Sequence, residues 1–215
     1  MTTTSLKNKY DSIIFDLDGT LWDSTANVAI AWQAAKQEVD YIKDDIDQAA
    51  VRSITGLTYK TIFEKLFPYL DEHKREEFKA IAAKKEIDTL TELGGDLYPE
   101  LEETLKYLQA NYKLFLVSNC QNGYAETFFE HSKLKHYFLG YQCYGTKNLP
   151  KWDNIKDVVN DFDLKSPVYV GDTQADYEAT VKAGVPFIFA SYGFGKVEQG
   201  MVATVDSLAK LREIL

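Results

Sequence analysis

The sequence has few cysteines and no long apolar run, and each shortage excludes a class of protein. Two cysteines, Cys120 and Cys143, occur in 215 residues, which is too few for a disulfide framework. No apolar run approaches the roughly 18 to 20 residues of a membrane-spanning helix. The polar segment 1–10 has no hydrophobic signal core. We therefore expect a cytoplasmic protein that does not bind a membrane.

Basic residues are also in short supply, with 24 against 33 acidic ones and a net charge of −9. Nucleic acids and anionic membrane surfaces both attract basic protein surfaces, so we expect neither as a partner. A small phosphorylated metabolite is compatible with this charge, because a few local cations can dominate one pocket. The length predicts one domain, or one domain with a smaller insert, in a monomer or a small homo-oligomer.

Short apolar runs alternate with segments of helical spacing along most of the chain. The runs, typical of buried parallel strands, are 12–15, 113–117, 167–170 and 185–190, with a weaker one at 141–144. The helical segments are 99–110, 153–162 and 175–183. This alternation predicts an α/β fold with a doubly wound, Rossmann-like parallel sheet. Ligands bind such sheets beyond the carboxyl ends of the strands.

The interval between Asp23 and about Leu93 breaks this alternation, because it has helical spacing and no convincing strand. Four helices are expected there, the first capped by Ser24 and the others near 45–55, 58–67 and 71–93. Gly94-Gly95 then permits a sharp return to the sheet.

Two interpretations of this interval are open. It is either part of one larger core or a helical cap folded over the active edge of the sheet. We favour the cap, because the interval begins and ends near the end of the first strand. The expected domains are then an α/β core of residues 1–22 and 95–215 and a helical cap of residues 23–94.

Two acidic clusters follow predicted strands. Asp16 and Asp18 lie in a D-x-D-G-T string, and side chains two apart at a strand end point the same way. Crowded carboxylates repel, so such a pair commonly needs a cation or serves proton transfer. Asp172 and Asp176 follow another strand. Turn formation and helix capping are the alternative roles, but two clusters at neighbouring strand ends would form a hard-oxygen site that suits Mg²⁺.

Two weaker signals indicate phosphate binding. Ser118 and Asn119 follow the second strand, where a hydroxyl and nearby backbone N–H groups could hold a phosphate oxygen. A solvated serine is the alternative. Lys147 and Lys151 precede the helix that leads to the third strand, and either could balance the acidic site. Most surface lysines have no such role.

In this order the four groups resemble the four motifs of the haloacid dehalogenase superfamily, subfamily I. The resemblance covers about residues 10–195 and includes members similar to phosphoglycolate phosphatase. It implies a Rossmann-like core with an inserted helical cap of the first type (C1). The usual third motif often has proline after its lysine, whereas Trp152 follows Lys151 here. We favour Lys151, and Lys147 is the alternative.

The resemblance also implies a role for each site residue. Asp16 would attack phosphorus and form an aspartyl-phosphate, while Asp18 would act as general acid and base. Mg²⁺ would be held by the Asp16 carboxylate, the Asp18 backbone carbonyl and Asp172. Thr20 and Asp176 would be supporting residues.

Ser118, Asn119 and Lys151 would bind the phosphoryl group. The resulting hypothesis is a Mg²⁺-dependent phosphatase of a small phosphomonoester, such as a phosphoglycolate-like compound, a sugar phosphate or a nucleotide. Arg52 and Gly56 fall at a possible cap tip, where Arg52 could meet a substrate carboxylate or simply be solvated. A phosphomutase of the same superfamily and a non-catalytic phosphoacceptor or binding module are the alternative functions.

Overall fold

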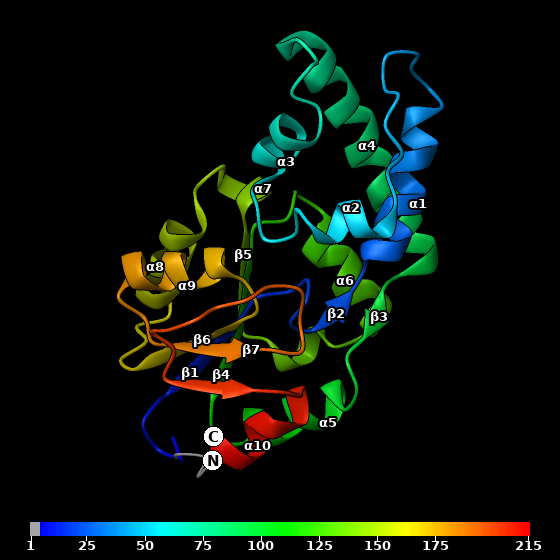
Figure 1. Ribbon diagram of the computed structural model, residues 1–215. Coiled ribbons are helices and arrows are strands. Elements are labelled where there is room, and N and C mark those ends of the chain that lie inside the picture. The colour runs from blue at the N-terminus through cyan, green and yellow to red at the C-terminus, as the bar shows by residue number, and fades with distance from the viewer. Residues whose placement is uncertain (1–4) are drawn as a thin grey trace.

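Six parallel strands form the central sheet in the computed structural model, which describes residues 5–215 (Figure 1). The strand order is β5-β4-β1-β6-β7-β8. The strands are β1 (Ser12–Phe15), β4 (Lys113–Ser118), β5 (Gly140–Cys143), β6 (Pro167–Gly171), β7 (Phe187–Ala190) and β8 (Ala203–Val205). All five predicted strands are present. The edge strand β8 was missed, because three residues are too few to show a pattern.

Alternate residues of β1 face two different layers of helices. Ile13 and Phe15 pack into one apolar cluster, whereas Ile14 packs into the other with Ile155 and Val158. The helices of the core are α5 (Leu101–Gln109), α6 (Tyr124–Ser132), α7 (Tyr144–Lys147), α8 (Lys151–Asp161), α9 (Gln174–Ala183) and α10 (Leu211–Ile214), with single turns η1 (Lys135–Tyr137) and η2 (Leu208–Lys210). Because both faces are covered, β1 is buried along its whole length.

The predicted core helices are present with shifted ends. α8 begins at Lys151, two residues earlier than predicted, so this lysine belongs to the first helical turn. α9 ends at Ala183, and the φ of 73° at the following Gly184 is the left-handed C-cap conformation that we expected. α6 was not predicted, because its aromatic and β-branched residues are weak helix formers.

A helical insert lies between β1 and β4, beyond the carboxyl ends of the strands (top of Figure 1). It is joined to the core by a two-stranded antiparallel ribbon that was not predicted. The ribbon and the insert comprise β2 (Trp22–Asp23), β3 (Asp96–Leu97), α1 (Thr25–Lys36), α2 (Gln48–Arg52), α3 (Tyr59–Leu66) and α4 (Glu72–Leu93). All four predicted helices are present, but α2 has only five residues.

The predicted cap at Ser24 is correct in position but not in its hydrogen bonding. Ser24 is the N-cap residue of α1, but its side chain makes no capping hydrogen bond. Its hydroxyl instead donates to Asp18 at 2.8 Å. The charged acceptor makes the stronger hydrogen bond, and this contact connects the start of the insert to the site described below.

Buried aromatic rings fill the interior of the insert. Phe63 contacts Trp32 and Phe78 with ring centroids 5.2 and 5.8 Å apart, and burying each such side chain stabilises the fold by roughly 1.5–3 kcal/mol. The chain leaves the insert at Gly94, whose φ is 68°, and a Cβ there would lie 2.2 Å from the ring of His131. Among residues 5–215, no helix is both long and apolar enough to cross a bilayer.

Candidate active site

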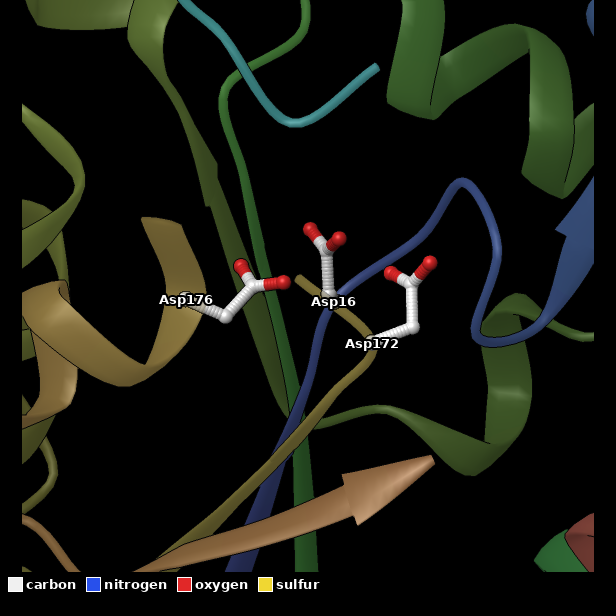
Figure 2. Close-up of side chains that lie close together, drawn as sticks. All are labelled: Asp16, Asp172 and Asp176. Carbon is white, nitrogen blue, oxygen red and sulfur yellow. The ribbon is translucent and has the colours of Figure 1, made fainter. Parts of the chain in front are cut away.

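Three buried aspartates converge at the carboxyl edge of the sheet (Figure 2). Asp16 follows β1, Asp172 follows β6, and Asp176 lies in the first turn of α9. Strands β1 and β6 are paired neighbours, so the residues after them meet at one point. One carboxylate oxygen of each aspartate lies within 4.8 Å of the others. The predicted convergence of the two acidic clusters is therefore present in the structure.

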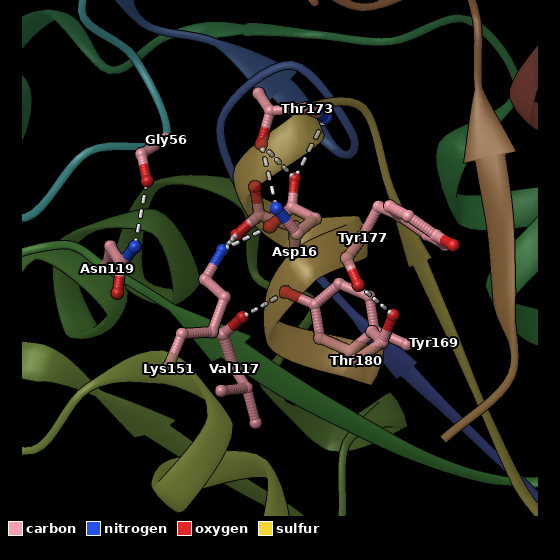
Figure 3. A network of polar contacts seen from close by, with 10 residues as sticks. Asp16, Gly56, Val117, Asn119, Lys151, Tyr169, Thr173, Tyr177 and Thr180 are labelled. Carbon is pink, nitrogen blue, oxygen red and sulfur yellow. Dashed lines mark hydrogen bonds and ion pairs between the residues drawn. The ribbon is translucent and has the colours of Figure 1, made fainter. Parts of the chain in front are cut away.

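Lys151 bridges Asp16 and Asp176, and Figure 3 shows it beside Asp16. Its Nζ lies 2.8 Å from Asp16 Oδ1 and 2.5 Å from Asp176 Oδ1, and its side chain is only 3% exposed. Burial lowers the pKa of Lys151, but attraction to Asp16 and Asp176 outweighs that effect and raises it above its ordinary value. Lys147 instead pairs with Asp157 at 2.6 Å near the surface. The structure therefore brings Lys151 to the site and leaves Lys147 outside it.

Asp176 is held by the first turn of α9 as well as by Lys151. The backbone N–H and hydroxyl of Thr173 donate to Asp176 Oδ2 at 3.0 and 2.6 Å. The Asp176 N–H donates back to the Thr173 hydroxyl at 3.2 Å, which completes a capping box. Because both carboxylate oxygens of Asp176 have donors, Asp176 is placed to orient Lys151.

Asp172 has one oxygen without a partner. Its Oδ2 accepts a hydrogen bond from the Phe194 N–H at 2.7 Å, whereas Oδ1 is buried and has no partner among residues 5–215. Burial, then repulsion from Asp176 and Asp16, raises the pKa of Asp172 well above its usual value. A buried unpaired oxygen of this kind is costly without a cation. The oxygen donors present fit Mg²⁺, which prefers carboxylate and carbonyl ligands.

Gly19 lies in close contact with Asp172. Its φ of 81° favours glycine, and a Cβ there would lie 2.2 Å from Asp172 Oδ2. The glycine of the D-x-D-G-T string thus lets the loop after β1 pass against Asp172. Thr20 follows, buried, with its carbonyl accepting a 2.8 Å hydrogen bond from the Tyr192 hydroxyl.

The environment of Asp16 raises its pKa to about 7. Burial is the largest cause and repulsion from Asp176 the next, while Lys151 opposes both. A second cation beside these carboxylates would favour the ionised form further. With its charge balanced, Asp16 would be an ionised carboxylate, which is the form that can act as a nucleophile.

Asp18 lies in a different environment, although it is only two residues away. Burial raises its pKa, and hydrogen bonds from Tyr124 and Ser24 oppose that rise. The two hydroxyls donate to Asp18 Oδ1 at 2.7 and 2.8 Å. A half-buried carboxyl with a raised pKa suits a general acid and base.

Ser118 and Asn119 extend the site from β4, the other neighbour of β1 in the sheet. Ser118 is buried and lines the same cavity as Asp16 and Asp18. Asn119 Nδ2 donates to the Gly56 carbonyl at 2.8 Å, so its side chain ties the insert to the core (Figure 3). Its Oδ1 is buried without a partner in the part of the chain that the structure describes.

Gly56 lines this cavity, whereas Arg52 does not. Arg52 forms an ion pair with Asp23, donates to the Thr25 hydroxyl at 3.3 Å, and lies over the Phe194 ring. Its side chain is 48% exposed. Arg52 is therefore paired and exposed, outside the lining of this cavity.

Some residues of the site were not found from the sequence. Glu86 on α4 is 3% exposed and accepts hydrogen bonds from Trp32 Nε1, Tyr59 OH and Gln121 Nε2 at 2.6, 3.2 and 2.9 Å. Nothing in the sequence marks Glu86, because it follows two lysines on a charged helix and reads as a surface residue. Thr173 had a usable signal, the capping-box spacing to an acidic residue three positions on.

The chain is similar to known proteins in both sequence and fold. The model of the haloacid dehalogenase-like hydrolases matches residues 13–190. A phosphoglycolate phosphatase of Aquifex aeolicus is 28% identical over 193 residues, with 86% of each chain covered. A solved structure described as a predicted phosphatase from Clostridium acetobutylicum is 25% identical, with a TM-score of 0.79 over 95% of this chain and 97% of that one.

A second solved structure, described as a predicted phosphoglycolate phosphatase from Haemophilus somnus, has a TM-score of 0.84 at 23% identity. It covers 97% of this chain and 99% of its own, and at that identity it supports the fold alone. The family match spans most of the chain and includes the three aspartates and Lys151. The chain belongs to the haloacid dehalogenase-like hydrolases.

Proposed function

We propose that this protein is a Mg²⁺-dependent phosphatase of a small phosphomonoester and that Asp16 is its nucleophile. The observation that carries the proposal is the buried Lys151, which contacts Asp16 and Asp176 beside the unpaired oxygen of Asp172. A site of three buried carboxylates and one lysine suits a phosphoryl group with a divalent cation. The names of the curated relatives add phosphoglycolate as a candidate substrate.

In the proposed reaction the Asp16 carboxylate attacks phosphorus, and the bond to the leaving alcohol breaks as an aspartyl-phosphate forms. Asp18 donates a proton to the departing oxygen. It then accepts a proton from the water that hydrolyses the aspartyl-phosphate. Ser118 and the Lys151 ammonium hold phosphoryl oxygens in line with the attack.

Mg²⁺ would be held by the Asp16 and Asp172 carboxylates and the Asp18 backbone carbonyl. When bound, it screens the repulsion between nucleophile and phosphate. Asp176 keeps Lys151 directed at Asp16 through the capping box with Thr173. Asp176 therefore acts through the lysine, as a positioning residue.

We also propose that residues 23–94 act as a cap over a core of residues 1–22 and 95–215. The insert contributes Gly56 and Glu86 to a cavity whose floor is Asp16, Asp18 and Ser118. The hydrogen bond from Asn119 to Gly56 links the two parts beside the cavity, which both residues line. A cap in this position excludes water from the aspartyl-phosphate and selects the leaving group.

The test is hydrolysis of a generic aryl phosphate by the purified protein with Mg²⁺, with chelator, and by the Asp16→Asn variant. We expect activity that requires Mg²⁺ and falls at least about 10³-fold in the variant. Unchanged activity in Asp16→Asn would remove Asp16 as nucleophile. A phosphorylated protein that releases no phosphate would favour a phosphomutase instead.

A further inference from the structure

The cavity beside Asp16 and Asp18 is where a leaving group must sit. Both residues line it, the proposed nucleophile and the proposed proton donor, and its volume is about 70 Å³. That is about half of the ~150 Å³ cavity that holds benzene. With the insert placed as it is, the cavity accepts a group of a few heavy atoms.

A second cavity nearby does not compete for this role. It has a volume of about 180 Å³ and is lined by Lys151 and Lys182, but in the described chain neither Asp16 nor Asp18 lines it. A leaving oxygen in that cavity would be out of contact with the proton donor. The lysines of the second cavity therefore line a space that the proposed proton donor does not reach.

The first cavity has acidic groups and no basic ones. Its lining contains the carboxyl groups of Asp16, Asp18 and Glu86, and among residues 5–215 it contains no lysine, arginine or histidine. At the Asp16 end, Lys151 and the proposed Mg²⁺ balance the charge. At the Glu86 end, the described residues supply no such cation.

Glu86 has room for one further donor. A carboxylate offers about four acceptor positions. Trp32 and Tyr59 both donate to Oε2, and Gln121 alone donates to Oε1. One position on Oε1 is therefore open, on a side chain that is buried and lines the cavity.

We infer that the leaving group is a short alcohol that carries no negative charge and donates a hydrogen bond from a hydroxyl or an ammonium group to Glu86. This inference rests on the proposed phosphatase function and names the substrate class within it. At pH 8 a leaving group with a carboxylate, such as glycolate, would face the ionised Glu86 without a cation. Arg52, the candidate partner for such a carboxylate, is already paired with Asp23 outside the cavity.

The test compares four phosphomonoesters with leaving groups of similar size. The panel is 2-hydroxyethyl phosphate, 2-aminoethyl phosphate, propyl phosphate and 2-phosphoglycolate, each with Mg²⁺ at pH 8. We expect kcat/KM for at least one of the first two compounds to exceed that for 2-phosphoglycolate by about tenfold or more, which corresponds to about 1.4 kcal/mol. Propyl phosphate, which cannot donate, should be poorer than both.

Glu86→Gln tests the residue itself. The amide keeps the size of the side chain but removes its charge, so the preference against 2-phosphoglycolate should shrink at least about threefold, and 2-aminoethyl phosphate should lose the most. Glu77→Gln is the matched control, because Glu77 is an exposed residue of the same helix, away from the cavity. Thermal unfolding of both variants reports any loss of folding.

The outcomes distinguish the inferred leaving group, the role of Glu86 and the proposed phosphatase function from one another. A preference for 2-phosphoglycolate, or for propyl phosphate, in the wild-type protein would overturn the inference and leave the phosphatase function standing. Unchanged ratios in a folded Glu86→Gln variant would remove Glu86 as the specificity residue. Absence of Asp16-dependent hydrolysis with all four compounds and with the aryl phosphate would instead overturn the proposed function.

Discussion

At the scale of single residues, Lys151 has the most constrained surroundings of the site. It is buried between Asp16 and Asp176, so its charge and theirs depend on each other. Burying charges is costly, and the cost is offset only while every partner is present. Removing the lysine would leave two carboxylates facing each other in a dry environment.

Lys151→Ala should therefore lower both stability and activity. Breaking a buried pair by removing one partner costs about 3–5 kcal/mol, and the lost attraction should raise the pKa of Asp16 further. Lys147→Ala is the control, because Lys147 pairs with Asp157 near the surface. Urea unfolding and aryl phosphate hydrolysis of both variants check this. Equal losses in the two variants would contradict the assignment of Lys151.

Glu86 should give the protein a pH-dependent stability that is independent of metal. Burial is the main cause that raises the pKa of Glu86 from 4.5 to about 7. The folded protein thus keeps a proton that the unfolded chain releases, and the free energy of unfolding should fall as pH rises through that range. The expected loss is on the order of 3 kcal/mol.

Urea unfolding at pH 5 and pH 8 in chelator measures this loss. In Glu86→Gln the decrease between the two pH values should be smaller than in the wild type, because the amide does not titrate. Glu77→Gln should retain the wild-type decrease. A decrease of equal size in all three proteins would show that Glu86 does not titrate in this range.

At the scale of elements, the first turn of α9 has two roles. The capping box of Thr173 and Asp176 satisfies the first turn of the helix, and the same Asp176 holds Lys151. The N-cap of α3, by contrast, satisfies the first turn of its helix but does not hold a residue of the site. Thr58, the N-cap of α3, accepts a hydrogen bond from the Thr61 N–H in the insert.

Removing either cap should lower stability, but only removing the cap of α9 should also lower activity. Thr173→Ala and Thr58→Ala should each destabilise the protein by about 1 kcal/mol, the usual cost of losing an N-cap. Only Thr173→Ala should also reduce kcat, because Asp176 loses a donor and holds Lys151 less firmly. Steady-state kinetics and thermal unfolding of both variants check this. Full activity in Thr173→Ala would show that this cap does not support the active site.

At the scale of the whole molecule, folding brings together carboxylates that repel each other. Asp16, Asp172 and Asp176 lie within 4.8 Å in a buried site with one lysine. A ligand that binds only the folded state stabilises the whole protein. The metal is therefore expected to contribute to global stability as well as to chemistry.

Mg²⁺ at about 100 times its dissociation constant should stabilise the wild-type protein by about 2.7 kcal/mol. Asp172→Asn should abolish that response while raising the unfolding temperature of the metal-free protein, because one repelling charge is gone. Thermal unfolding with Mg²⁺ and with chelator measures both effects. An undiminished Mg²⁺ response in Asp172→Asn would exclude Asp172 as a ligand.

The amino-acid sequence alone determined five of the six strands of the sheet, the helical insert and the two acidic clusters. Each of these depends on neighbouring residues, since apolar runs, helical spacing and the D-x-D-G-T string are local patterns. The order of strands places Asp16 and Asp172 side by side once the sheet is parallel, so their convergence could also be predicted.

Only the tertiary structure decided which of the remaining candidates reach the site. Lys151 meets Asp16 across 135 positions of sequence, and Trp32 meets Glu86 across 54. Arg52 instead forms an ion pair with Asp23, and the Ser24 hydroxyl donates a hydrogen bond to Asp18. The physical reason is that a charged or polar side chain takes the strongest partner that packing brings within reach, and packing depends on contacts between distant segments.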